Sequence, residues 1–293
     1  MTDRADNVAR AQAFAVLATL LWPLQEAAGA VLMRGHHAAQ VVAFRYITHL
    51  LLLGAFVLPR YGLRPFMTQR PGLQMLRGLC MFGMPGGFML AAGVAPISWV
   101  WTVFWLMPAM ALAGAWLFLN ERPGWFAWAV AFAGPLAAAA IGEAVPGSPA
   151  GTAGAVLMGA SFAGYVVLSR VLRREHLIAS LFYTAVGALL PMAYFAWRVW
   201  TPVTAAEIIP AFITGLLSLL ILGAFDKATD AAPVTIVAPI IPMVLLWEFG
   251  LKVLQHQTTV FTADIAGITL VSLSCVLWLS SNYLQERRQR KSA

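Results

Sequence analysis

Charged residues are scarce in this 293-residue chain. Asp, Glu, Lys and Arg make up only 11% of it, whereas about 25% is usual for a soluble protein. Hydrophobic residues reach 60% of the sequence, and the mean hydropathy is +0.77. This balance excludes an ordinary water-soluble globular protein.

Cysteine is equally rare, since Cys80 and Cys275 are the only two. Both fall in apolar segments, where small buried hydrophobes are expected rather than a disulfide or a metal pair. The sequence lacks a glycine-rich loop ending in Lys-Ser or Lys-Thr, zinc-like spacing of His and Cys, and a recognisable nucleophile–base pair. These absences argue against an enzyme, an ATP-driven pump, and a metal or cofactor site.

Long apolar runs occupy most of the chain. A helix needs about 20 mostly apolar residues to cross a bilayer, and helices are the only spanning form that suits runs of this length. We therefore predict an all-α integral membrane protein with ten transmembrane helices. The ten runs are Ala11–Met33, Ala38–Leu58, Gln74–Ala92, Ile97–Leu119, Gly124–Gly142, Gly151–Ser169, Leu177–Trp197, Ile208–Phe225, Ala231–Trp247 and Ile265–Leu284.

The basic residues predict the orientation. If the N-terminus is cytoplasmic, fourteen Lys and Arg residues fall in cytoplasmic segments and three on the other side, with four of the fourteen at Arg287, Arg288, Arg290 and Lys291. Such an excess marks the cytoplasmic side. We expect a multi-pass protein of the inner (plasma) membrane with both termini in the cytoplasm. The net charge of +7 is dispersed over the loops, so no nucleic-acid partner is expected.

The connection Glu143–Ala150 divides the ten predicted spans into two sets of five. Because five is odd, the second set enters the membrane from the opposite side, which is the arrangement of an inverted repeat. We predict one five-helix repeat over residues 1–143. The second covers residues 144–293 and ends in a basic cytoplasmic tail.

Several motifs carry a family resemblance. Phe44-Arg45 lies in the second run, and Pro108 is followed by Leu119-Asn120-Glu121-Arg122-Pro123 at the end of the fourth. With the five-plus-five plan, the chain resembles the drug/metabolite transporter superfamily in its ten-helix, EamA-like branch. The resemblance implies two inverted five-helix repeats around a central substrate cavity, working by alternating access.

The first run departs from that branch, because it reads Trp22-Pro23-Leu24-Gln25-Glu26 where Trp-Gly and small residues are usual. The following segment, Glu26–Arg34, is similar to the first helix of the small multidrug resistance branch. In that branch a membrane glutamate exchanges protons for cationic substrates. The resemblance implies such a role for Glu26 alone.

Ionisable residues within a membrane are costly and are functional candidates. Glu26 lies seven residues before the end of the first run, and Arg45 lies seven after the start of the second. Both are therefore about 10 Å deep from the same side, with His49 one turn beyond Arg45. We predict that Glu26, Arg45 and His49 form the substrate- or proton-binding cluster. A permanent Glu26–Arg45 ion pair remains the structural alternative.

Aromatic residues gather near this cluster. Trp22 shares a helix face with Glu26, Trp101 shares one with Trp105, and Phe162 and Tyr165 occupy the corresponding part of the sixth run. We predict that all five line the cavity, where an aromatic wall attracts an organic cation. Packing in the bundle or against lipid is the alternative explanation.

Three further charged sites receive structural interpretations. Arg77 is expected to snorkel toward the headgroups. Asp226 is expected in a solvated turn, and Glu248 with Lys252 as a local helix pair.

We predict a secondary active transporter, proton-coupled, that exports a small organic amine or cation as a monomer or homodimer. One alternative is an uptake or exchange carrier for a zwitterionic, amino-acid-like metabolite. A membrane scaffold or receptor without transport is the second alternative.

Overall fold

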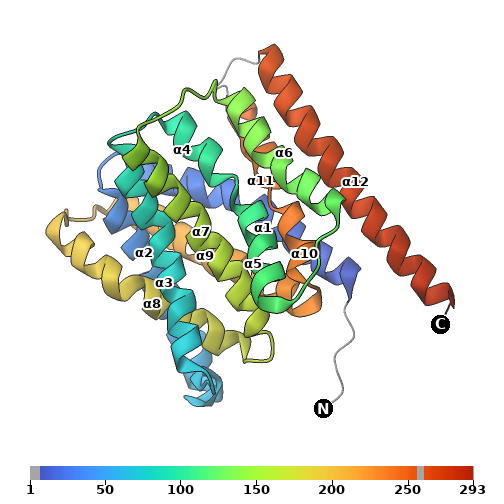
Figure 1. Cartoon of the computed structure of the whole chain (residues 1–293). Helices are drawn as coiled ribbons and strands as arrows, with labels where there is room; N and C mark the ends of the chain where they lie inside the picture. Colours follow the sequence, from blue (N-terminus) through green and yellow to red (C-terminus); the bar gives the residue numbers. More distant parts are fainter. Residues whose placement is uncertain (1–6, 256–260, 293) are drawn as a thin grey trace.

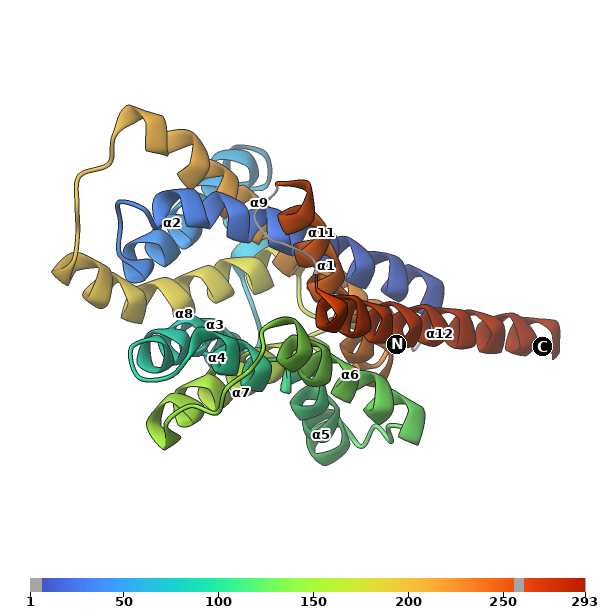
Figure 2. The same ribbon diagram turned by 90° about the horizontal axis from the view of Figure 1, so that it is seen from above.

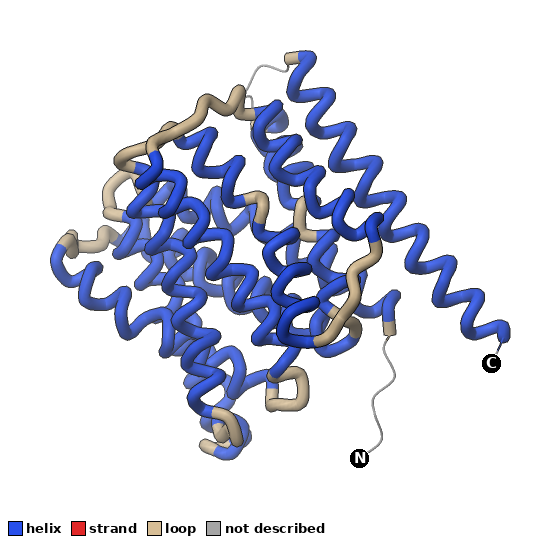
Figure 3. Tube along the Cα trace, viewed as in Figure 1, coloured by secondary structure: helices blue, strands red, loops and turns tan. Residues whose placement is uncertain are grey.

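The computed structural model describes residues 7–255 and 261–292, with side chains up to residue 284. Within these residues every regular element is a helix (Figure 3). The elements, in chain order, are α1 (Val8–Leu32), α2 (Ala38–Tyr61), η1 (Arg64–Phe66), α3 (Pro71–Ala92), α4 (Ile97–Phe104), α5 (Met107–Leu119), α6 (Trp125–Ile141), α7 (Pro149–Val171), α8 (Leu177–Arg198), α9 (Ala205–Ala231), α10 (Val234–Val237), η2 (Ala238–Ile240), α11 (Met243–Leu254) and α12 (Thr262–Ser292).

The predicted all-α membrane fold with ten apolar spans is confirmed. Nine described segments are long and apolar enough to cross a membrane, and the shorter α6 is the tenth. They form one bundle (Figure 1). Helix α12 packs along α6 and continues past the other helices (Figures 1 and 2).

Two spans that the sequence presents as continuous are broken. The fourth span divides into α4 and α5, with Trp105 and Leu106 at the break. The ninth divides into α10, η2 and α11 around Pro239 and Pro242, and it ends at Leu254 rather than at Trp247. Proline explains both breaks, because it lacks the N–H that a continuous helix requires and its ring crowds the preceding turn. Each broken span is the fourth in its predicted set of five. The inverted repeat itself remains a prediction.

Polar residues fix where several helices begin. The Asn7 side chain accepts from the backbone N–H of Arg10 at 2.9 Å, and Ser148 likewise caps α7. At the start of α9, Thr204 and Glu207 form a capping box. These caps satisfy backbone donors that a helix leaves free in its first turn.

Glycines allow α3 to approach α7 and α8 closely. A Cβ on Gly78 would lie 2.6 Å from the carbonyl oxygen of Tyr183 and 2.7 Å from Gly187 Cα. Gly87 meets α7 in the same way at Gly154 and Met158. Small residues permit such backbone contact, which stabilises helix pairs in a lipid environment.

The two predictions about sidedness rest partly on residues beyond this description. Arg4 and the side chains of Arg287, Arg288, Arg290 and Lys291 lie outside the described residues. The cytoplasmic placement of both termini therefore stays a prediction.

We expect Gly78→Ala to destabilise the fold, because its new methyl group meets backbone atoms that cannot rotate away. Overpacking of this kind costs about 1–3 kcal/mol, measured as the free energy of unfolding in detergent. Gly72→Ala is the matched control on the same helix, since nothing lies within 4 Å of a Cβ there. It should change the stability by less than about 0.5 kcal/mol, and equal effects of the two variants would contradict the packing argument.

Candidate functional site

A cavity of about 520 Å³ opens at the end of the bundle where α1 finishes and α2 begins. We call this the main cavity, its end of the bundle the cavity end, and the other the closed end. Helices α1, α2, α3 and α11 provide most of the wall. The lining includes Glu26, Ala30, Arg34, Arg45, Met84, Phe88, Trp101, Met158, Glu248 and Lys252.

The structure brings Glu26 and Arg45 together in the wall of the main cavity. A guanidinium nitrogen of Arg45 lies 3.7 Å from a carboxylate oxygen of Glu26. The Glu26 side chain is 46% exposed, whereas that of Arg45 is 14% exposed. The pair is therefore loose, and Glu26 lines the main cavity.

Gln25 holds the guanidinium of Arg45 in place. With its side-chain amide oriented so that the oxygen faces Arg45, this oxygen lies 2.7 Å from the nearest guanidinium nitrogen. Gln25 itself is buried, so this bond is shielded from water. The sequence prediction missed Gln25, although an amide in the middle of an apolar run was a signal of a polar partner nearby.

His49 does not join this pair. Its side chain is fully buried, and neither ring nitrogen has a hydrogen-bond partner among the described residues. The His49 ring stacks with that of Tyr46 at a centroid distance of 6.4 Å. The predicted three-residue cluster thus contains two residues in direct contact, Glu26 and Arg45.

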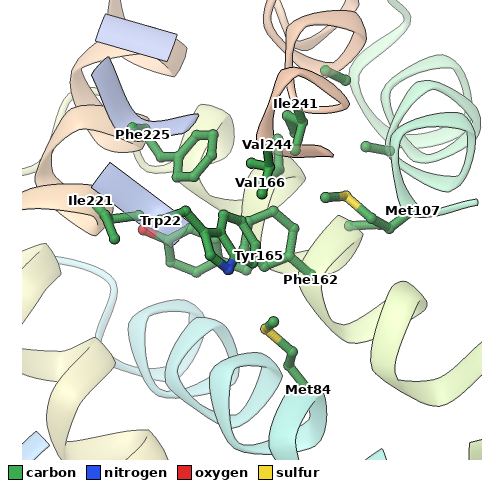
Figure 4. Packing of buried hydrophobic residues seen from close by; sticks show 14 of the residues in the cluster. Trp22, Met84, Met107, Phe162, Tyr165, Val166, Ile221, Phe225, Ile241 and Val244 are labelled. Carbon is green, nitrogen blue, oxygen red and sulfur yellow. The ribbon is translucent and has the colours of Figure 1, made fainter. Parts of the chain in front are cut away.

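Aromatic side chains pack together between the main cavity and the closed end. The rings of Trp22 and Phe162 lie 5.0 Å apart, and Phe225 is 5.6 Å from Phe162. Figure 4 shows these rings packed together with Tyr165. Trp22, Phe162 and Tyr165 are buried and are not among the residues that line the main cavity. We call Trp22, Phe104, Phe162 and Phe225 the aromatic floor.

The remaining two predicted cavity residues, Trp101 and Trp105, differ in the cavities that they line. Trp101 lines the main cavity and also a second cavity of about 290 Å³. Trp105 lines only the second cavity. Glu248 and Lys252 border both cavities and form the predicted local pair, with 2.8 Å between their charged atoms.

On the side of the aromatic floor that faces the closed end lies an ion pair that the sequence prediction missed. A guanidinium nitrogen of Arg77 donates to a carboxylate oxygen of Asp226 at 3.0 Å, and their side chains are 1% and 8% exposed. The Tyr165 hydroxyl donates to the other oxygen of Asp226 at 3.2 Å. Arg77 also donates to the Thr184 hydroxyl at 2.8 Å and to the carbonyl of Ser180 at 3.1 Å.

This pair corrects two expectations. Arg77 was expected to snorkel to the membrane surface, and it is instead buried between helices. Asp226 was expected in a solvated turn, but α9 continues to Ala231 and places Asp226 within the bundle. The sequence did hold a signal for this pair. Arg77 lies near the start of the third run and Asp226 directly follows the eighth run, so two opposite charges lie near the ends of two spans.

The chain resembles known transporters. No protein-family model matches it. A Rickettsia bellii protein named S-adenosylmethionine uptake transporter is 29% identical over 210 residues, which cover 69% of this chain and 70% of that protein. A Rickettsia conorii protein of the same name is 28% identical over 210 residues, 69% of each chain.

A solved structure shares the fold. It superposes on this chain with a TM-score of 0.80, covering 92% of this chain and 96% of the other, at 18% sequence identity. That likeness shows the fold alone. The named relatives and the apolar helices indicate a multi-pass membrane transporter.

The two ion pairs should differ in their effect on stability. Glu26→Gln removes a half-exposed charge, so it should change the free energy of unfolding by less than about 1 kcal/mol. Asp226→Asn leaves a buried guanidinium without its counter-charge, so it should lower that free energy by about 3–5 kcal/mol. Unfolding in detergent, followed by tryptophan fluorescence without added solute, measures both. Equal losses would contradict the difference in burial.

Proposed function

We propose that this protein is a carrier for the uptake or exchange of an amino-acid-like metabolite that bears both charges, with S-adenosylmethionine as the leading candidate. The observation that carries the proposal is the loose Glu26–Arg45 pair in the wall of the main cavity. The relatives named S-adenosylmethionine uptake transporter support it, and they favour uptake over the export of a simple amine.

The cavity offers a partner for each part of such a solute. Arg45 accommodates the carboxylate, because a guanidinium donates two parallel hydrogen bonds to it. Glu26 takes the ammonium group. Phe88 and Trp101, whose rings lie 5.9 Å apart, present faces to a flat base or a sulfonium cation. The volume of about 520 Å³ lies within the range of about 300–1,000 Å³ that small-molecule sites occupy.

The solute replaces the protein's own ion pair in this proposal. Because Glu26 and Arg45 are held 3.7 Å apart, a zwitterion that enters between them gives each charge a new partner. A simple amine would engage Glu26 and leave Arg45 with Gln25 alone. This difference supports the amino-acid-like solute.

Transport would proceed by alternating access between two inverted five-helix repeats, as the resemblance to drug/metabolite transporters implies. The carrier would lie in the inner membrane with cytoplasmic termini. We further propose that Glu26 couples transport to protons. If protons compete with the cation at Glu26, a pH gradient alone should drive solute flux, and Glu26→Gln should abolish that dependence and also weaken exchange, because it removes the partner of the ammonium group.

Uptake into proteoliposomes tests the substrate. We expect saturable uptake of labelled S-adenosylmethionine, which excess unlabelled solute inhibits. Arg45→Gln should weaken it by about 10–100-fold, since a hydrogen bond to a charged group contributes about 1.5–3 kcal/mol. Binding of decarboxylated S-adenosylmethionine, which lacks the group that Arg45 holds, should change by less than about threefold.

Glu143→Gln is the matched control, because Glu143 is exposed on a loop and does not line the main cavity. It should transport as the parent protein does. Equal losses for both solutes in Arg45→Gln would exclude a carboxylate contact. Absence of any solute-dependent flux or tryptophan quenching would favour the scaffold or receptor alternative.

A further inference from the structure

We propose that Arg77, Asp226 and Tyr165 form the gate of the closed end, and that their bonds break when the bundle opens there. The proposal goes beyond the proposed function, because it concerns how the bundle is closed and requires no particular solute. It starts from the cost of a buried charge in a membrane protein.

The position of the pair fits a gate. The main cavity reaches inward to Met84 and Met158, and the aromatic floor lies next along the axis. Phe225 of that floor directly precedes Asp226 on α9, and Phe162 lies one turn before Tyr165 on α7. The pair therefore forms a polar layer between the floor and the closed end.

One bond of this layer, from Arg77 to Asp226, connects two helices that hardly pack on each other. Helix α3, which carries Arg77, packs mainly on α7 and α8, whereas α9, which carries Asp226, packs mainly on α1 and α2. Helix α7 packs on both α3 and α9, whereas direct packing of α3 on α9 is slight. The long Arg77 side chain reaches across this seam and lies 3.0 Å from Asp226, so the ion pair joins α3 directly to α9.

A second set of bonds closes the rim at the same end. Arg170 of α7 donates to the carbonyls of Thr229 and Asp230, at 2.9 and 3.3 Å, near the end of α9. Glu121 accepts from the backbone N–H of Thr235 at 3.0 Å and lies 3.7 Å from Arg170. The described residues thus form an aromatic, a polar and a rim layer toward the closed end.

Because the Arg77–Asp226 pair is buried, it can stabilise a closed state of the gate and still allow an open state. While it is dry, separating Arg77 from Asp226 leaves two uncompensated charges, which is strongly unfavourable. Once the helices part, water solvates each charge and removes most of that penalty. In the present state the Glu26–Arg45 pair is the more exposed of the two pairs. When the bundle closes around the main cavity and opens at the closed end, Glu26 and Arg45 would become buried, and Arg77 and Asp226 would become exposed to water.

Cysteine labelling in nanodiscs, where both ends are accessible, tests the gate. In a Cys80→Ser, Cys275→Ser background, Ser169→Cys reports the closed end, since Ser169 is buried one turn beyond Tyr165. Ala30→Cys reports the main cavity, whose wall it lines. A polar maleimide should label position 30 quickly and position 169 slowly.

Adding Asp226→Asn should reverse this pattern. We expect labelling at position 169 to rise by about tenfold or more, equivalent to about 1.4 kcal/mol in the gate equilibrium, while labelling at position 30 falls. Tyr165→Phe removes one bond and keeps both charges, so it should act in the same direction with a smaller effect. Glu143→Gln should leave both rates unchanged.

A rise at both positions would mean that the bundle has loosened as a whole, and it would overturn the gate. Parental rates in both Asp226→Asn and Tyr165→Phe would overturn it as well. If Asp226→Asn does not fold, the reciprocal change in Tyr165→Phe decides. Because no solute is present, this result is independent of whether S-adenosylmethionine is transported.

Discussion

A charge within the membrane requires either a partner or water, and this requirement organises the bundle. The structure meets it in two ways. Glu26 and Arg45 stand in the wall of an open cavity, where exposure lowers the cost of a loose contact. Arg77 and Asp226 are dry, and a tight contact with several further hydrogen bonds compensates them. The same two functional groups thus occupy opposite environments along one axis.

The aromatic floor separates these environments and shares helices with both. Helix α1 carries Trp22 of the floor and, one turn later, Glu26 of the cavity. Helix α7 carries Phe162 of the floor and, one turn later, Tyr165 of the polar layer. Because a helix is stiff over one turn, a rotation of α1 or α7 cannot move the floor alone. Ring packing and ion pairing are therefore mechanically linked by the spacing of residues in the sequence.

Hydropathy and residue counting predicted the architecture and two ion pairs, Glu26–Arg45 and the local pair Glu248–Lys252. The depth of Glu26 and Arg45 followed from counting residues between each charge and the end of its run, because α1 and α2 are adjacent and joined by a short turn. Counting cannot predict which side chains meet across helices distant in sequence. Arg77 and Asp226 are 149 residues apart, and nothing local to either one indicates the other.

The same limitation explains the misplaced span ends. A hydropathy window ends a span at its first charge, so the eighth run stopped at Phe225. The helix continues through Asp226, because Arg77 and Tyr165 satisfy the carboxylate inside the bundle. Similarly, hydropathy presents the ninth run as continuous, and the break around Pro239 and Pro242, a 3-10 turn between two helices, depends on neighbours that fill it.

Charge balance also bears on which solutes suit the main cavity. Before a solute enters, Glu26 and Arg45 partly neutralise each other, and Gln25 supports only the guanidinium. A solute with a carboxylate and an ammonium group gives both Arg45 and Glu26 a partner when it replaces this contact, and a sulfonium that it also carries is left to the aromatic faces of Phe88 and Trp101. A monovalent amine leaves a guanidinium beside a neutral amide, and that cost grows as the cavity closes and water leaves. Closure of the cavity therefore discriminates between the two solutes more strongly than binding to the open cavity does. The cost of the unpaired guanidinium is largest in the step that moves the solute across the membrane.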